Sequence, residues 1–127
     1  MSRKIRVVGV VPNKEAVIIE GFDNSLENLK EFVNGDIEVV KPFSEGAVLI
    51  TNRNSKAQNY MPNRGIRTKN GVLLDIICGS FVVVWTKKGT DSFCSLPKAK
   101  ADKYLKMFKK SERLIRNGLG GVDMIEY

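Results

Sequence analysis

Residues 72–86 read VLLDIICGSFVVVWT and point to a fold centred on β-structure. The runs 72–77 and 81–86 are rich in β-branched and aromatic side chains, which predicts two strands, the most buried of the chain. Gly79 and Ser80 lie between the runs and favour a bend or a bulge there. We therefore expect the core of the protein to be built around a β-sheet.

Further strands are predicted on both sides of this stretch, because short apolar runs alternate with turn residues. The first two form a hairpin across the turn Pro12-Asn13-Lys14, and Asn70-Gly71 suits a type I′ hairpin turn. A last edge strand is predicted in the tail LGGVDMIEY. Apart from the tail and the two central runs, the predicted strands cover residues 3–11 and 16–20, which form the first hairpin, and residues 36–40, 47–51 and 91–94.

Two helices are predicted, a short one at about residues 25–34 and a long C-terminal one at about residues 97–117. In the first, Leu26, Leu29, Phe32 and Val33 recur at helical spacing, Asn24 or Ser25 can cap the start, and Asn34-Gly35 can end it. In the second, Ser95 can cap, Pro97 suits the first turn and Gly118 can end the helix. The predicted fold class is α+β, a mostly antiparallel sheet with these two helices, in a single domain over residues 1–127.

The composition restricts the chemistry. The 127 residues carry a formal net charge of +7 and no histidine, which excludes Ser-His-Asp and Cys-His nucleophiles and histidine-ligated zinc. Neither a phosphate-binding loop nor a dinucleotide-binding glycine motif occurs, and Asp75 is expected to be a solvated or backbone-bonded carboxylate. We expect no catalytic residue, no metal, no cofactor and no enzymatic activity.

The cellular setting is predicted from segments that are missing. From residues 1–12, which have charges but no long apolar stretch, we expect no signal peptide, and the longest uncharged stretch near the middle, residues 76–86, is too short to cross a membrane. Cys78 and Cys94 are expected to be buried free thiols, although one disulfide between neighbouring strands is the alternative. A soluble, cytoplasmic protein is expected.

The positive charge is concentrated after residue 50. Residues 1–50 carry a net charge of −2, residues 51–96 of +5 and residues 97–127 of +4. Within the second region, residues 52–65 are polar, rich in Asn and predicted to form a long loop, a type of segment that often carries function.

This loop is the first candidate binding site. Arginine can grip phosphate with two donors, amide groups can read base edges, and a tyrosine ring can stack on a base. The candidate residues for an anionic, nucleotide-type ligand are Arg53, Tyr60, Asn63, Arg64 and Arg67, joined by Arg113 from the predicted long helix. The alternative is that the Asn residues only serve turn geometry while the arginines are solvated.

The predicted long helix is the second candidate site. Its apolar side carries Ala101, Tyr104, Leu105, Phe108 and Ile115, and much of the other side carries Lys103, Lys106, Lys109, Lys110, Arg113 and Arg116. Such a face suits diffuse attraction to nucleic acid, or it is only a solvated surface. Met107 and Leu114 fall outside the apolar stripe, which suggests a contact with a second copy or with a host protein.

Several segments together resemble a known family. The sequence SLENLKEFVNGDIEVV at 25–40 is followed by GAVLITN at 46–52, MPNRG at 61–65, LLDIICGSFVVV at 73–84 and FCSL at 93–96. This order resembles a family of small proteins catalogued as domain of unknown function family 3846, over roughly residues 5 to 110. The resemblance implies a setting in phages, plasmids and bacterial mobile elements, and it implies no reaction.

These observations favour a small non-catalytic phage or mobile-element protein that counteracts host defence by sequestering an anionic nucleotide-type ligand in the host cytoplasm. The alternatives are a nucleic-acid-binding protein that uses the lysine helix, and an inhibitor of a host complex with an acidic partner. Convergence of residues 52–67 and the last helix on one pocket would favour the small ligand.

Overall fold

A single antiparallel sheet of six strands lies at the centre of the computed structural model, which describes residues 3–87, 90, 92–111, 114–116 and 122–124. Five strands follow the order β2-β1-β7-β4-β3. The short strand β8 pairs with the last two residues of β7, Trp85 and Thr86. The strands are β1 (Lys4–Val10), β2 (Val17–Asp23), β3 (Ile37–Val40), β4 (Ala47–Asn52), β7 (Phe81–Thr86) and β8 (Phe93–Cys94). The predicted α+β class with a mostly antiparallel sheet is confirmed.

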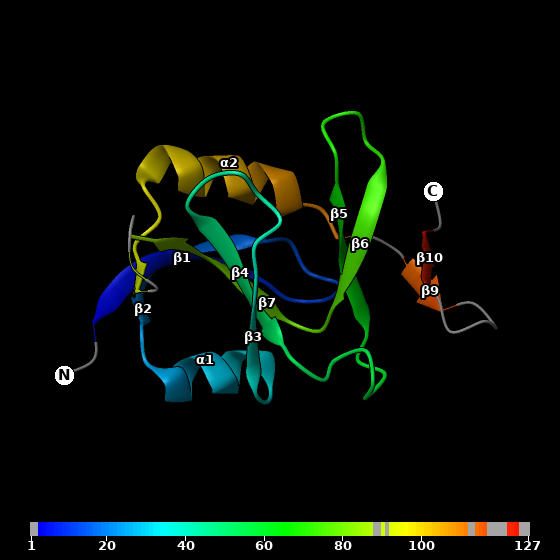
Figure 1. The fold of residues 1–127 in the computed structure, drawn as a ribbon, viewed down its shortest axis with the longest axis horizontal. Coiled ribbons are helices and arrows are strands. Elements are labelled where there is room, and N and C mark those ends of the chain that lie inside the picture. The colour runs from blue at the N-terminus through cyan, green and yellow to red at the C-terminus, as the bar shows by residue number, and fades with distance from the viewer. Residues whose placement is uncertain (1–2, 88–89, 91, 112–113, 117–121, 125–127) are drawn as a thin grey trace.

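The sheet is buried on both faces, because a helix covers each of them (Figure 1). Side chains alternate along a strand, so Phe81 and Val83 of β7 pack toward α2 whereas Val82 and Val84 pack toward α1. All six residues of β4 are buried, which makes this strand the centre of the core. This two-sided burial explains why the central strands are uninterrupted apolar runs in the sequence.

Helix α1 (Leu26–Val33) agrees closely with the predicted short helix. The Ser25 hydroxyl accepts a hydrogen bond from the Asn28 backbone N–H at 3.1 Å, and Asn34 ends the helix in the left-handed conformation with φ 63°. Leu29 and Val33 point into the core. The capping residue, the apolar spacing and the stop signal were all correctly predicted.

Helix α2 (Lys98–Phe108) is much shorter than the predicted helix 97–117, and that prediction is wrong. At the end of α2 the backbone carbonyls bind residues from other parts of the fold. The Phe108 carbonyl accepts from Arg64 Nε at 3.0 Å, and the Lys109 carbonyl accepts from the Ala16 N–H at 3.1 Å. The predicted cap is also wrong, because the Ser95 hydroxyl accepts from the Arg6 backbone N–H at 2.9 Å.

A separate hairpin, β5 (Pro62–Arg67) with β6 (Leu73–Cys78), stands beside the main sheet (Figure 1). It shortens the predicted loop 52–65, because β5 begins at Pro62. The turn is closed by the Gly71 N–H on the Thr68 carbonyl at 3.0 Å, and Gly71 has φ 84° whereas Asn70 has no positive φ. The turn is therefore a three-residue loop rather than the predicted type I′ turn.

Burial along β6 is also lower than predicted, because only Ile76, Ile77 and Cys78 are buried. Cys78 is buried and Cys94 half-buried, and no disulfide joins the two cysteines. Two further strands, β9 (Leu114–Arg116) and β10 (Val122–Met124), pair with each other. None of the helices in the described ranges is long and apolar enough to span a membrane.

Candidate functional site

Two of the predicted ligand residues, Asn63 and Arg64, are fully buried and therefore cannot bind a ligand from an exposed loop. The Asn63 amide donates to the carbonyls of Val10 and Gly79 at 3.1 and 2.9 Å. Its oxygen accepts from Arg64 Nη1 at 2.7 Å. This prediction is corrected: β5 carries the pair inward, where the two side chains hold separate elements together.

Arg64 joins three parts of the fold. Its Nε donates to the Phe108 carbonyl at the end of α2, and its Nη2 donates to the Lys14 carbonyl in the turn after β1. Arginine suits this position, because its planar group presents several donors in fixed directions. The segment MPNRG, one of those on which the family resemblance rests, thus contributes two buried side chains that hold separate elements of the fold together.

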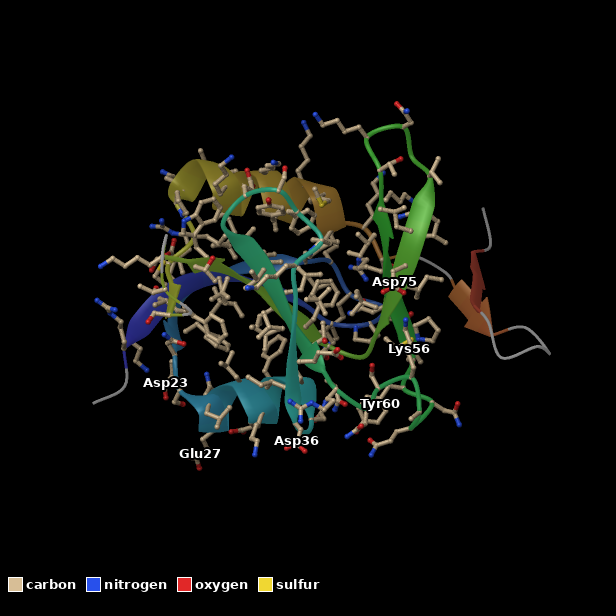
Figure 2. The ribbon with its side chains drawn as sticks, viewed as in Figure 1. Asp23, Glu27, Asp36, Lys56, Tyr60 and Asp75 are labelled. Atoms are coloured by element: carbon tan, nitrogen blue, oxygen red, sulfur yellow. The ribbon has the colours of Figure 1, made fainter. Side chains whose placement is uncertain are left out.

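The three remaining described residues of the predicted site lie in different places. The Tyr60 hydroxyl donates to the Asn34 carbonyl at 3.2 Å, beside the end of α1 (Figure 2), and its ring lines a shallow hollow of about 430 Å³. Arg53 lines a second cavity and Arg67 a third. Arg113 lies outside the described residues. The structure therefore does not bring the predicted set together in one pocket.

The basic surface of the predicted long helix is also divided. Lys103 and Lys106 are exposed on α2, but Lys109 and Lys110 follow the helix, and the backbone of Arg116 belongs to β9. The same correction applies to Leu114 and Ile115, which lie in β9. A continuous lysine face along one long helix is not formed.

One cavity does combine residues from the two candidate regions. It has a volume of about 360 Å³ and lies between α2, the tip of the β5–β6 hairpin and the loop after β3; we call it the helix-side cavity. Its lining comprises Pro42, Phe43, Ser44, Glu45, Arg67, Thr68, Lys69, Leu74, Lys103 and Met107. Arg67 from the hairpin and Lys103 from the helix thus face one space.

Glu45, the acidic residue in this lining, is already held by α2. Its carboxylate accepts from Lys100 Nζ at 2.7 Å and Lys103 Nζ at 3.3 Å, and from the Tyr104 hydroxyl. The hydrogen bond from Lys100, followed by that from Tyr104, lowers the pKa of Glu45 to about 2. Burial, together with the Glu45 carboxylate, raises the pKa of Tyr104, so Glu45 is ionised and Tyr104 neutral at neutral pH.

The cations of the cavity lining outnumber its acids. Arg67, Lys69 and Lys103 oppose only Glu45 in the lining. The Arg67 guanidinium lies over Gly65, with Nη1 only 3.0 Å from where a Cβ at that position would lie, so the missing side chain makes room for it. The lining therefore favours a ligand with negative charge.

The apolar part of the lining is unusually exposed. Leu74 and Met107 are 64% and 49% exposed, and Val72 nearby on the hairpin is 60% exposed. Leu74 and Met107 both line the helix-side cavity, together with Phe43. An aromatic or aliphatic group of a ligand can lie on this surface while its anionic group meets the cations.

Sequence reasoning missed Phe43, Glu45, Lys69 and Leu74 as members of this site. Residues 42–46, PFSEG, have the composition of a turn, but no local pattern says which helix a turn will contact. Lys69 was passed over as part of a hairpin turn. Within the described ranges, no group of three or more His, Cys, Asp or Glu side chains is placed to hold a metal ion.

Comparison with known proteins identifies a relationship at the level of a family. A family model described as Domain of unknown function (DUF3846) matches residues 5–109, most of the chain. No curated protein and no solved structure matches. The expected resemblance is therefore confirmed.

Proposed function

We propose that this chain, which belongs to the DUF3846 family, binds an anionic nucleotide-type ligand in the helix-side cavity. One observation carries the proposal: Arg67 from the hairpin and Lys103 from α2 line the same cavity. Cations from two separate elements that meet at one concave place suit a small anion better than a flat surface does.

The rest of the lining supports the same ligand class. Phe43, Leu74 and Met107 offer an apolar wall for a base, and Lys69 adds a cation at the hairpin tip. The role we propose is binding without turnover. The protein, of a phage or a mobile element, would sequester a nucleotide signal of host defence in the host cytoplasm. It is the setting implied by the sequence resemblance.

Isothermal titration with 3′,5′-cyclic AMP and ADP-ribose tests the proposal. Charge-assisted hydrogen bonds contribute about 1.5–3 kcal/mol, so Arg67→Gln and Lys103→Gln should each weaken binding about tenfold or more. Lys100→Gln is the matched control, because Lys100 also binds Glu45 but does not line the cavity. No heat with either nucleotide at millimolar concentration, or an equal loss in the control, would refute the proposal.

A second candidate, inhibition of a host complex with an acidic partner, is favoured by the exposure of Leu74 and Met107 beside the cations. Exposed apolar side chains of this size mark interaction surfaces in many soluble proteins. In that case, the nucleotides would give no heat, whereas a complex isolated from host lysate would be lost with Leu74→Glu and retained with Leu26→Glu. Leu26 is 57% exposed on α1 and serves as the matched control.

A further inference from the structure

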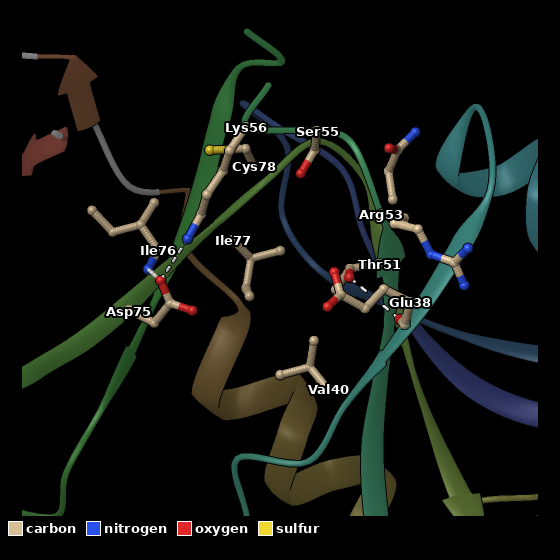
Figure 3. A pocket seen from close by; sticks show the side chains of 11 residues that line it. Glu38, Val40, Thr51, Arg53, Ser55, Lys56, Asp75, Ile76, Ile77 and Cys78 are labelled. Carbon is tan, nitrogen blue, oxygen red and sulfur yellow. Dashed lines mark hydrogen bonds and ion pairs between the residues drawn. The ribbon is translucent and has the colours of Figure 1, made fainter. Parts of the chain in front are cut away.

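A second cavity, of about 290 Å³, lies between the α2-facing side of the main sheet and the β5–β6 hairpin (Figure 3). We call it the sheet-side cavity. Its lining comprises Glu38, Val40, Thr51, Asn52, Arg53, Ser55, Lys56, Asp75, Ile76, Ile77 and Cys78, none of which lines the helix-side cavity. It is therefore a separate site from the one proposed above.

Ser55 provides the first sign of a ligand. The residue is 7% exposed, and among the described residues nothing forms a hydrogen bond with its hydroxyl, although its backbone is bonded to Asn52 and Tyr60. Figure 3 shows the hydroxyl directed into the cavity. The hydroxyl oxygen keeps some contact with solvent through the cavity, and a molecule that enters the cavity can take the place of that water as its hydrogen-bond partner.

The charges around the cavity provide the second sign. Lys56 Nζ and Asp75 Oδ1 are 2.8 Å apart, and the Ile76 N–H also donates to Asp75 Oδ1, so this pair is already satisfied. Glu38 and Arg53 have no side-chain ion pair or hydrogen bond with any part of the chain that the structure describes. One unpaired carboxylate and one unpaired guanidinium thus remain for a ligand.

Glu38 and Arg53 come from neighbouring parts of the β3–β4 pair. Glu38 in β3 lies opposite Thr51 in β4, and Arg53 directly follows β4, where its N–H donates to the Asp36 carbonyl at 2.8 Å. Both residues belong to the lining of the cavity. In Figure 3 both side chains start from the β3–β4 side of the cavity, the Glu38 carboxylate extending toward Thr51 and the Arg53 guanidinium in the opposite direction.

The floor of the cavity is apolar. Val40 and Ile77 point toward each other across it in Figure 3, and Ile77 is 6% exposed. A ligand that fits the whole lining therefore carries a positive group, a negative group and an aliphatic part. A simple anion would meet Glu38 and Asp75, and a simple cation would meet Arg53 and Lys56.

We propose that the sheet-side cavity binds a zwitterionic aliphatic α-amino acid. The ammonium group pairs with the Glu38 carboxylate, and the carboxylate group accepts hydrogen bonds from the Arg53 guanidinium and the Ser55 hydroxyl. The aliphatic side chain packs on Val40 and Ile77. No covalent step is involved, and the proposal does not depend on the anionic ligand of the helix-side cavity.

The test uses L-leucine and two analogues that each lack one charge: 4-methylpentanoate, without the ammonium, and 3-methylbutylamine, without the carboxylate. Binding is followed by amide chemical shifts of the ¹⁵N-labelled full chain. We expect L-leucine to shift the signals of Glu38, Ser55 and Ile76 in a saturable manner. Each analogue should bind at least tenfold more weakly, because it leaves one charge of the site unpaired.

Variants locate the site. Arg53→Gln and Glu38→Gln should each weaken L-leucine binding at least tenfold, and Ser55→Ala several-fold. The matched controls are Arg3→Gln and Glu27→Gln, exposed residues remote from the cavity (Figure 2 shows Glu27 on α1), and they should leave the affinity unchanged. All variants are compared by thermal unfolding so that a folding defect is recognised.

Three results would overturn the proposal. The first is no saturable shift of these amides with 20 mM L-leucine. The second is equal binding of either single-charge analogue, which would show that only one charge is recognised. The third is equal weakening by Glu27→Gln or Arg3→Gln, which would show non-specific electrostatics.

Discussion

Replacement of Arg64 by methionine separates a structural role from a ligand-binding role for this residue. Methionine keeps much of the side-chain length and removes every donor. Among the residues that the structure describes, the change removes hydrogen bonds to the backbone carbonyls of Phe108, Lys14 and Asn63 and to the side-chain oxygen of Asn63. Because Arg64 is fully buried, water cannot replace those donors at the acceptors left behind.

The size of the effect follows from this geometry. Hydrogen bonds to a charged donor contribute about 1.5–3 kcal/mol each, and they are not additive when they share one group. A buried acceptor left without its donor costs about 1–3 kcal/mol, and because the change leaves several such acceptors we expect Arg64→Met to cost about 3–5 kcal/mol in total. With a urea slope near 2 kcal/mol/M, the unfolding midpoint should fall by about 2 M.

Urea unfolding followed by the fluorescence of Trp85, the single tryptophan, measures the change. Arg53→Met is the matched control, because Arg53 is exposed, and it should change the free energy of unfolding by no more than about 0.5 kcal/mol. Should Arg64→Met not fold, Arg64→Lys keeps the charge, loses the fork of donors and should give a smaller but measurable loss. The reasoning is refuted if Arg64→Met costs less than about 1 kcal/mol.

The remaining predictions concern stability and capping. The pKa of Glu45 is lowered to about 2 in the folded protein, so its stabilisation is complete above about pH 4.5 and is lost as the pH falls toward 2. Glu45→Gln should therefore reduce stability by about 1–2 kcal/mol at pH 7 and flatten the acid limb of a stability–pH curve; an unchanged limb would contradict this. Gly46→Ala should cost about 1–3 kcal/mol, because a Cβ there would lie 2.7 Å from the Trp85 ring, and the native fluorescence of that ring should shift; a neutral result would show that the ring moves freely. Ser25→Ala should cost about 1 kcal/mol in thermal or urea unfolding through loss of the α1 cap, and Ser25→Gly less than that.

Local patterns predicted most elements of the fold. The apolar runs at 47–51 and 81–86 are central strands because side chains alternate toward α1 and α2, and both faces need apolar residues. The spacing of Leu29 and Val33, with Ser25 before them, located α1 within one residue at each end. These features depend on residues close together in the sequence, where propensity and capping act directly.

The end of α2 could not be predicted from local pattern. Residues 109–117 continue the helical spacing, but the carbonyls of Phe108 and Lys109 are bound by Arg64 and Ala16. These partners are distant in sequence, and their hydrogen bonds compete with the next helical turn. The predicted lysine face was lost with that turn.

The candidate site shows the same division. The positive charge after residue 50, the absence of histidine, the strand and cap patterns and the family resemblance can all be read from the amino-acid sequence, since each depends on composition or local order. The inward direction of Arg64, the placement of Arg53 and Arg67 in different cavities, and the shared cavity of Arg67 and Lys103 emerge only in the folded protein. The physical reason is that the direction of a side chain depends on strand register and on the packing of the β5–β6 hairpin against the sheet and α2. Both are fixed by contacts between residues far apart in the chain.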